Sequence, residues 1–284
     1  MLEIIEHTLK DSIKLIPFLF ITYLLMEFLE HKTSSKINKT IKKSGKYGPL
    51  IGGILGLLPQ CGFSVMATNL YMGRIITIGT LITIYLTTSD EMLPILISEN
   101  VAIGVIIKIL AIKLLIGVIS GIIIDIIFNL KNKGKKIEEE HVDFCEHEHC
   151  HCEEGILKSA IRHTISIFAF ILLITFILNL AIHNIGEEKL SSMIMNNKIV
   201  GPMIAGVVGL IPNCASSVII SQLYIEKVIS SAIMISGLLV NAGVGLLVLF
   251  RVNRNLKENI KITVILYGIG VISGILLELI GFTI

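Results

Sequence analysis

Two polar motifs interrupt long apolar stretches and carry side chains of the kind that bind metal ions. Residues 59–62 read Pro-Gln-Cys-Gly, and residues 212–215 read Pro-Asn-Cys-Ala. Amide oxygens suit hard cations such as manganese and thiolates suit soft ions such as copper(I), zinc or trivalent arsenic, so the set indicates a transition or heavy metal without selecting one. Packing of small residues at a tight tip is the alternative role for the two cysteines. The predicted ligands at these motifs are Gln60, Cys61, Ser64, Asn213, Cys214 and Ser217.

A second kind of break follows in the next apolar stretch, where Asp90 and Glu91 are adjacent. Ionisable side chains inside a membrane are costly and indicate function. We therefore predict that both acids belong to the metal site, with Asn241 as the polar residue at the corresponding later position. The alternative is that the two acids lie in a wet outer loop. Lys113 lies within another apolar stretch, and we predict that it pairs with Asp90 or Glu91 and that this pair carries coupling protons.

Four threonines recur at helical spacing on the approach to these acids. They either line a polar path or pack helices together, a common role of threonine in membranes. The four are Thr77, Thr80, Thr83 and Thr87.

A third group of possible ligands is concentrated in a polar linker at 141–152, which reads HVDFCEHEHCHC. Cys and His at this density bind zinc, copper or nickel. The segment lacks the paired spacing of a folded zinc module, so we predict a flexible cytoplasmic loop that captures metal. A solvated acidic linker with incidental histidines is the alternative. The predicted capture residues are His141, Cys145, His147, His149, Cys150, His151 and Cys152.

The composition places these motifs in a membrane protein. The chain has 284 residues, of which 53% are hydrophobic and only 16% charged, whereas soluble domains carry about 25% charged residues. Its apolar runs approach or exceed the length that crosses a hydrocarbon core of roughly 30 Å. We see no cleavable signal peptide, P-loop or catalytic nucleophile arrangement. We therefore expect a multi-pass protein of the cell membrane, in contact with the lipid bilayer, that is not an enzyme and has no cofactor and no nucleic-acid partner.

An internal repeat organises the chain. Residues 48–71 and 201–224 align at an offset of 153 residues with 12 of 24 positions identical, including the Pro and Cys of the two polar motifs. The same offset aligns the sequence GVISGI at 117–122 with GVISGI at 270–275. Chance similarity between apolar helices does not reproduce Pro, Cys, Gly and Tyr in one register, so we infer a duplication.

The charges of the loops indicate that the two copies have opposite orientations. Residues 31–47 hold six lysines and no acid, whereas the equivalent 184–198 has no net charge; residues 251–261 are basic, whereas the equivalent 98–100 is not. The positive-inside rule therefore places equivalent loops on opposite sides of the membrane. This pattern predicts inverted repeats, with both termini outside and the linker inside.

The predicted fold is all-α, with two inverted-topology repeats and about ten membrane segments. The arms 48–58 and 62–72 are each about half a bilayer long, which predicts a re-entrant hairpin in each repeat, followed by a broken helix. A Pro-kinked transmembrane helix is the alternative to the hairpin. We divide the chain into a first repeat at 1–130, a cytoplasmic linker at 131–155 and a second repeat at 156–284.

The motifs LLPQCG and TTSDEMLP, with the later echo LIPNC, resemble the ten-transmembrane heavy-metal exporter family, also described as manganese transporters or arsenic efflux proteins and related by name to the ArsP organoarsenical permeases. The resemblance covers about 5–125 and 156–282, outside the linker, and implies metal export. The layout also resembles elevator transporters of the divalent-anion type, which implies a possible homodimer.

These patterns predict a secondary transporter that exports a heavy or divalent transition metal, such as manganese or zinc, by alternating access coupled to protons. Two alternatives remain open. The chain could transport an organic anion or an organoarsenical, with half-helix N-termini facing the substrate. It could also be a membrane metal sensor in which the linker is the working part.

Overall fold

The computed structural model describes residues 47–58, 62–89, 92–132 and 198–283, with isolated helical residues between 16 and 24 and between 157 and 176. Within this part of the chain all regular structure is helical. The prediction of an all-α fold is therefore confirmed for the described residues. The helices are α3 (Gly48–Gly56), α4 (Gly62–Met72), α5 (Ile78–Thr87), α6 (Met92–Ser98), α7 (Ile103–Asn132), α11 (Val200–Gly209), α12 (Cys214–Ile225), α13 (Ser231–Val240), α14 (Val244–Val252) and α15 (Leu256–Leu279).

Among the described residues, four stretches are long and apolar enough to cross a membrane: Ile78–Ser98, Ile103–Phe128, Ser231–Val252 and Leu256–Leu279. The first and third each combine two consecutive helices, α5 with α6 and α13 with α14, and are mostly buried inside the protein. The long helices α7 and α15 instead expose large aliphatic side chains that suit contact with lipid tails, including Ile107, Leu115, Ile119, Val264, Ile272 and Leu276.

Within the described residues, the helices α3 to α7 recur in the same order as α11 to α15, and the first residues of equivalent helices lie 152 or 153 residues apart. Both ends of α5 and α13 differ by 153 residues, as do the first residues of α7 and α15. Arg74 and Lys227, which are also 153 residues apart, both adopt left-handed backbone angles, with φ of 56° and 59°. Equivalent sequence has therefore produced equivalent local structure down to the turn that precedes α5 and α13.

The start of α5 and α13 is fixed in the same way in both halves. The hydroxyls of Thr77 and Ser230 cap these helices by accepting from the backbone amides of Thr80 and Ile233. Each capping hydroxyl also donates to a carboxylate on the long helix of its own half, Asp125 in α7 and Glu278 in α15. A carboxylate near a helix N-terminus is favoured by the positive end of the helix dipole. The long helices therefore anchor the broken ones.

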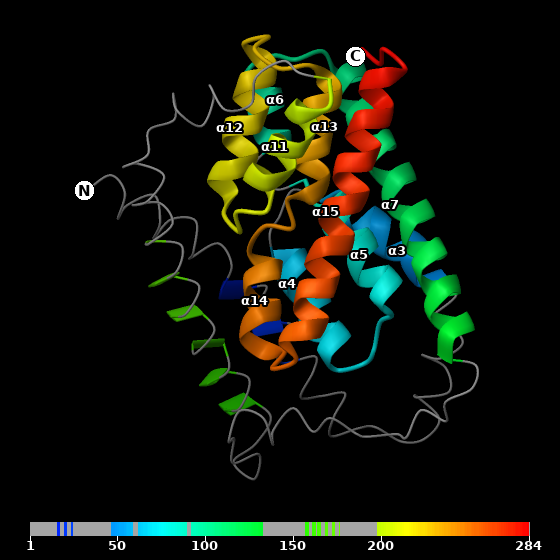
Figure 1. The fold of residues 1–284 in the computed structure, drawn as a ribbon. Helices are drawn as coiled ribbons and strands as arrows, with labels where there is room; N and C mark the ends of the chain where they lie inside the picture. Colours follow the sequence, from blue (N-terminus) through cyan, green and yellow to red (C-terminus); the bar gives the residue numbers. More distant parts are fainter. Residues whose placement is uncertain are drawn as a thin grey trace.

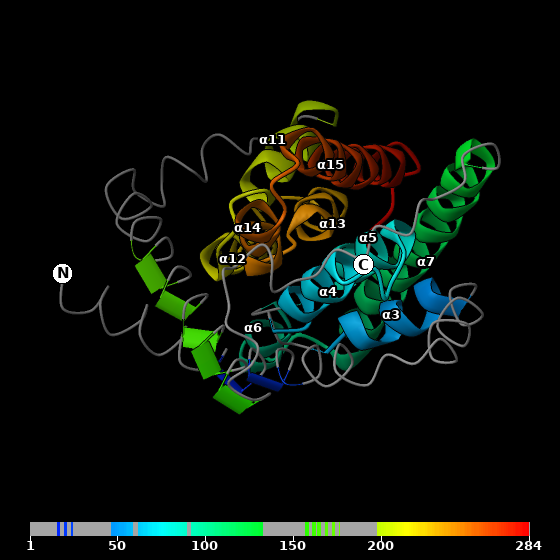
Figure 2. The same ribbon diagram turned by 90° about the horizontal axis from the view of Figure 1, so that it is seen from below.

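The long helices α7 and α15 run in opposite directions in Figure 1: α7 descends towards its C-terminal end, whereas α15 rises towards the C-terminus of the chain. The view from below separates α3, α5 and α7 from α11, α13 and α15 (Figure 2). Two pairs of helices make contacts across this division: α4 packs against α14, and α6 packs against α12. Each half therefore completes part of the other.

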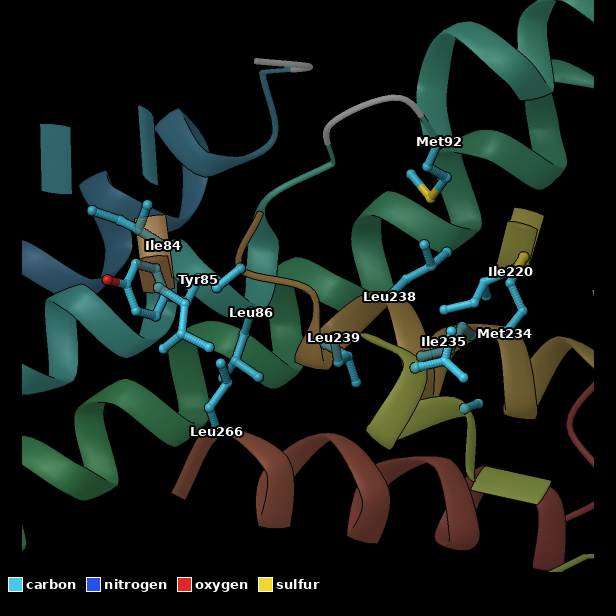
Figure 3. Close-up of a cluster of buried hydrophobic side chains, with 14 of the residues drawn as sticks. Ile84, Tyr85, Leu86, Met92, Ile220, Met234, Ile235, Leu238, Leu239 and Leu266 are labelled. Atoms are coloured by element: carbon cyan, nitrogen blue, oxygen red, sulfur yellow. The ribbon is translucent and has the colours of Figure 1, made fainter. Parts of the chain in front are cut away.

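The main hydrophobic core lies where the halves meet. It joins α5 to α13 and α15 and extends to α6 and α12 (Figure 3). Two further contacts tie the halves together. The hydroxyl of Tyr71 donates to the carboxylate of Glu258, and the ammonium of Lys261 lies 4.1 Å from the ring centroid of Phe128. The fully buried side chains of the core include Leu81, Ile82, Tyr85, Leu86, Met92, Ile220, Met234, Ile235, Leu239 and Leu266.

The threonines of α5 pack helices rather than line a path. The Thr83 hydroxyl donates to the carbonyls of Gly79 and Gly117, and the Thr87 hydroxyl donates to the carbonyl of Thr83. Glycines of α3 and α7 provide the room, because a methyl group on Gly121 would come within 1.9 Å of the Thr83 hydroxyl oxygen. Of the two roles that the sequence allowed, the structure supports helix packing.

Candidate functional site

The break after α5 begins with a buried hydrogen bond between a lysine side chain and the backbone. Thr88 is the C-cap of α5, and its backbone carbonyl accepts a hydrogen bond from the ammonium of Lys113 on α7. Lys113 is fully buried, and so are Thr88 and Ser89. Asp90 and Glu91, the predicted partners of Lys113, lie outside the described residues. The structure therefore places Lys113 at the broken end of α5, next to the segment in which the sequence has its two acids.

The break after α13 is held by a neutral side chain. Asn241 is the C-cap, and its side-chain oxygen accepts from the backbone amide of Gly243 at 2.9 Å. Gly243 has φ 54° and ψ −146°, a conformation that residues with a Cβ rarely adopt. Asn241 is only 2% exposed, so this polar turn lies inside the protein. Asn241 is equivalent by the repeat to Thr88.

The second break meets the first half at a close backbone approach. A methyl group on Gly245, near the start of α14, would lie 2.6 Å from the Cβ of Ser64 and 2.7 Å from its backbone carbon. Ser64 lies two residues after the start of α4 and is fully buried. The motif at 59–62 is followed directly by α4. That helix contacts the other half at Gly245, beside the break between α13 and α14.

Two hydroxyls hold this junction together, and sequence reasoning missed them. The Thr68 hydroxyl oxygen lies 2.6 Å from the Tyr85 hydroxyl and 3.0 Å from the Gly245 carbonyl, and the Tyr85 hydroxyl lies 3.1 Å from the same carbonyl. The three residues join α4, α5 and α14 and are buried. Because buried hydroxyls need partners, the single Tyr of the apolar stretch 75–97 was a usable signal.

The second motif leads into α12. The Ser216 hydroxyl donates to the backbone carbonyl of Asn213 at 2.7 Å, within the turn that begins α12. Asn213 and Ser217 are buried, and α12 packs against α6 of the first half. Each motif is therefore followed by a helix that contacts the broken helix of the opposite half. Residues 59–61 of the first motif lie outside the described residues, so the prediction that both motifs contribute to one metal site stays a prediction.

Several predicted ligands fall outside the part of the chain that the structure describes. These are Gln60, Cys61, Asp90 and Glu91, together with the linker residues His141, Cys145, His147, His149, Cys150, His151 and Cys152; Cys214 is described as the first residue of α12 but its side chain is not. Among the residues whose positions are given, no group of three or more His, Cys, Asp or Glu side chains could hold a metal. The described members of the predicted site are Ser64, Lys113, Asn213, Ser217 and Asn241.

Within the part of the chain that the structure describes, one buried polar side chain of α4 and one of α12 have no hydrogen-bond partner. Neither the nitrogen nor the oxygen of the Asn69 amide has one, and the hydroxyl of Ser221 has none. Ser221 is the repeat equivalent of Thr68, which is fully bonded. Leaving such groups unsatisfied costs roughly 1–3 kcal/mol each. The interior of α4 and α12 is thus more polar than helix packing requires.

Fold and site together define a multi-pass helical membrane protein with polar breaks inside its core. The model of one protein family, described as “Putative, 10TM heavy-metal exporter”, matches residues 1–185. The match covers more than half of the chain, so the chain belongs to this family. The resemblance inferred from the sequence motifs is confirmed. Neither a curated protein nor a solved structure matches the chain.

Proposed function

We propose that this protein is a secondary transporter that exports a heavy or divalent transition metal by alternating access, with its substrate site at the junction of the two helix breaks. The membership of the chain in a family of heavy-metal exporters supports the substrate class. The ion is proposed to be manganese, zinc or another heavy metal, exchanged against protons. No enzymatic step is part of the proposal.

The observation that carries the proposal is the contact between Ser64 and Gly245. It joins the helix that follows the Pro-Gln-Cys-Gly motif of one half to the break of the other half. Broken helices leave backbone carbonyls and amides inside a membrane protein, which is tolerated only where they are buried in protein or line a cavity, and they commonly form ion sites. Two such breaks in the core, each contacted by the helix that follows a polar motif of this chain, suit a cation better than packing alone.

We further propose that the two halves are inverted repeats, each with a re-entrant hairpin formed by α3 with α4 and by α11 with α12. The support is the offset of 152 or 153 residues between the first residues of equivalent helices, the equivalent carboxylate anchors at Asp125 and Glu278, and the opposite directions of α7 and α15. The short helices α3 and α11, of 9 and 10 residues, are too short to cross a bilayer, because at about 1.5 Å per residue they span only half of it. Such halves can exchange conformations, which is the basis of alternating access.

The ligands that we propose are the donors of the two motifs and the two breaks. The breaks contribute Asp90, Glu91 and Asn241, and the motifs contribute Gln60, Cys61, Ser64, Asn213, Cys214 and Ser217. The histidines and cysteines of the linker at 141–152 are proposed to capture metal on the cytoplasmic side and deliver it to this site. A homodimer in the lipid bilayer is part of the same proposal.

Transport by the purified protein in liposomes tests this function. Vesicles loaded with Mn²⁺, Zn²⁺ or arsenite are followed for release, with and without a pH gradient across the membrane. Cys61→Ala, Cys214→Ala and Asp90→Asn should each slow release of the transported ion, by at least about tenfold for a ligand whose loss costs 1.4 kcal/mol or more. Lys108→Gln is the matched control, because Lys108 is exposed on α7.

The alternatives predict different results. An organic-anion carrier would leave all three ions inside the vesicles and would show no thermal stabilisation by metal. A sensor would fail on deletion of 141–152, whereas a transporter should keep export at reduced efficiency. Normal transport by all three site variants would refute the proposed site.

A further inference from the structure

The ammonium of Lys113 is a buried positive charge at the C-terminal end of a broken helix. Its side chain is fully buried and donates to the Thr88 carbonyl, the C-cap of α5. Removing an ammonium from water is strongly unfavourable unless the protein supplies opposite charge or dipoles. The negative end of the α5 dipole and the Thr88 carbonyl supply part of that compensation. Lys113 therefore occupies the kind of position in which helix ends hold metal cations.

The second half shows that the fold does not need this charge. The equivalent of Thr88 is Asn241, the C-cap of α13, and the equivalent of Lys113 is Leu266, which is fully buried in the core. The break after α13 also lies between two short helices, and among the described residues the position equivalent to Lys113 holds the neutral Leu266 while Asn241 closes the turn onto Gly243. A lysine kept at the costly position in one half only therefore has a role other than holding the break together.

The two repeats differ at three charged positions around the break. Residues 90 and 91 are Asp and Glu in the first half, whereas their equivalents are Gly243 and Val244. The half that has the buried lysine also has the two acids next to the break, and the half that lacks the lysine lacks both acids. The lysine and the two acids that we propose as metal ligands therefore occur together in the first repeat.

From these observations we propose that Lys113 is a tethered substitute for the transported cation. This proposal rests on the proposed function. When no metal is bound, the ammonium of Lys113 lies at the C-terminal end of α5 and donates to the Thr88 carbonyl. A bound metal displaces the ammonium from the Thr88 carbonyl, so metal and Lys113 exclude each other. Because the site keeps a positive charge in both states, the empty transporter can change conformation and return for another ion.

This role separates two kinds of transport. Net export requires the empty transporter to reorient, whereas exchange of labelled for unlabelled metal involves only the loaded one. A neutral residue at position 113 should therefore abolish net export and preserve exchange. It should also raise the equilibrium affinity for metal by at least about tenfold, because the metal no longer competes with an internal cation that occupies its site most of the time.

The experiment compares the parent with Lys113→Met and Lys113→Gln in liposomes and in detergent. Lys113→Met keeps the length of the side chain and places an apolar residue where the second half has Leu266. Net efflux into metal-free buffer and exchange of isotopically labelled metal are measured for whichever of Mn²⁺ and Zn²⁺ the parent transports, together with the Kd of that metal. Lys113→Arg keeps the charge and should retain net efflux, and Lys108→Gln on the exposed face of α7 should behave like the parent.

The outcomes distinguish this inference from the proposed function. Loss of net efflux with retained exchange and tighter binding in the neutral variants would support the tethered cation. Equal reduction of efflux and exchange, or unchanged affinity, would overturn it while leaving metal export intact. If one neutral variant fails to fold, the other and Lys113→Arg still make the comparison; if the parent moves none of the metals, the proposed function fails and this inference fails with it.

Discussion

Asp125 and Thr77 are joined by a hydrogen bond of 2.7 Å that fixes the long helix α7 to the start of α5. The other carboxylate oxygen of Asp125 accepts from the backbone amide of Gly79 at 2.9 Å. Gly79 has no room for a side chain there, because an added methyl group would lie 2.4 Å from the Asp125 carboxyl carbon. The position of the broken helix, and with it the position of Thr88, depends on this carboxylate.

Replacing Asp125 by alanine should lower the free energy of unfolding by about 1.5–3 kcal/mol, because hydrogen bonds to a charged group are of this strength. Asp125→Asn should cost less, since its amide oxygen still accepts from Thr77 or Gly79. Thermal unfolding in detergent measures both. Glu226→Ala, at an exposed position, is the control; a melting temperature of Asp125→Ala equal to that of the parent would contradict the anchor.

Gly245 should tolerate no larger residue. Gly245→Ala brings a methyl group to 2.6 Å from the Cβ of Ser64, and relieving that contact requires α14 to move away from α4. Overpacking of this kind costs about 1–3 kcal/mol. We expect a lower melting temperature together with reduced metal transport, because the contact lies at the proposed site.

Two variants control this prediction. Gly268→Ala adds the same methyl group on α15 where nothing lies within 4 Å, so it should have little effect. Adding Ser64→Gly to Gly245→Ala should restore part of the stability, and only part, because the backbone carbon of Ser64 is also close at 2.7 Å. A fully stable single variant would show that α4 and α14 are not in contact.

The hydroxyls of Tyr85 and Thr68 should be energetically coupled. Tyr85→Phe and Thr68→Val each remove a hydroxyl from the cluster around the Gly245 carbonyl, and each should cost about 1 kcal/mol or more of stability. The double variant should cost less than the sum, because the shared hydrogen bond is lost only once. A double-mutant cycle of unfolding free energies tests this. Tyr267→Phe, whose hydroxyl contacts the Met203 carbonyl at the surface, is the control; strict additivity of Tyr85→Phe and Thr68→Val would contradict the cluster.

Thr83 should matter for stability and not for substrate. Its hydroxyl is bonded to two carbonyls and lies against Gly121, so Thr83→Ala should lower the melting temperature without changing the apparent KM for metal. Transport kinetics in liposomes, normalised to folded protein, separate the two effects. An increase in the apparent KM of tenfold or more would instead support the hypothesis that the threonines line the substrate path.

Sequence reasoning reached the parts of the fold that are governed by local pattern. The repeat predicted equivalent helices because identical Pro, Gly and Cys positions impose the same local conformations, and the breaks at residues 88–91 and near Asn241 followed from polar residues in apolar stretches. The cluster of Thr68, Tyr85 and Gly245 could not be found in this way. Its members lie up to 177 residues apart and are joined only when α4 packs on the opposite half.

The sequence pattern also could not predict what the threonine side chains of α5 contact. Threonines at helical spacing mark one face of α5 but do not indicate whether water or glycine lies opposite it. The matching glycines of α3 and α7 decided this, and their register with α5 is a tertiary property. The buried ammonium of Lys113 was expected to need a partner, whereas its bond to the Thr88 carbonyl required the crossing of α5 and α7.

The packing of α4 on α14 has a consequence for biosynthesis. When the ribosome has finished the first repeat, the Gly245 carbonyl that bonds to Thr68 and Tyr85 has not yet been synthesised. The first half must therefore wait in the membrane, incompletely packed, until the second half is inserted beside it. Two fragments produced from separate messages should for the same reason accumulate only when both are made in one cell.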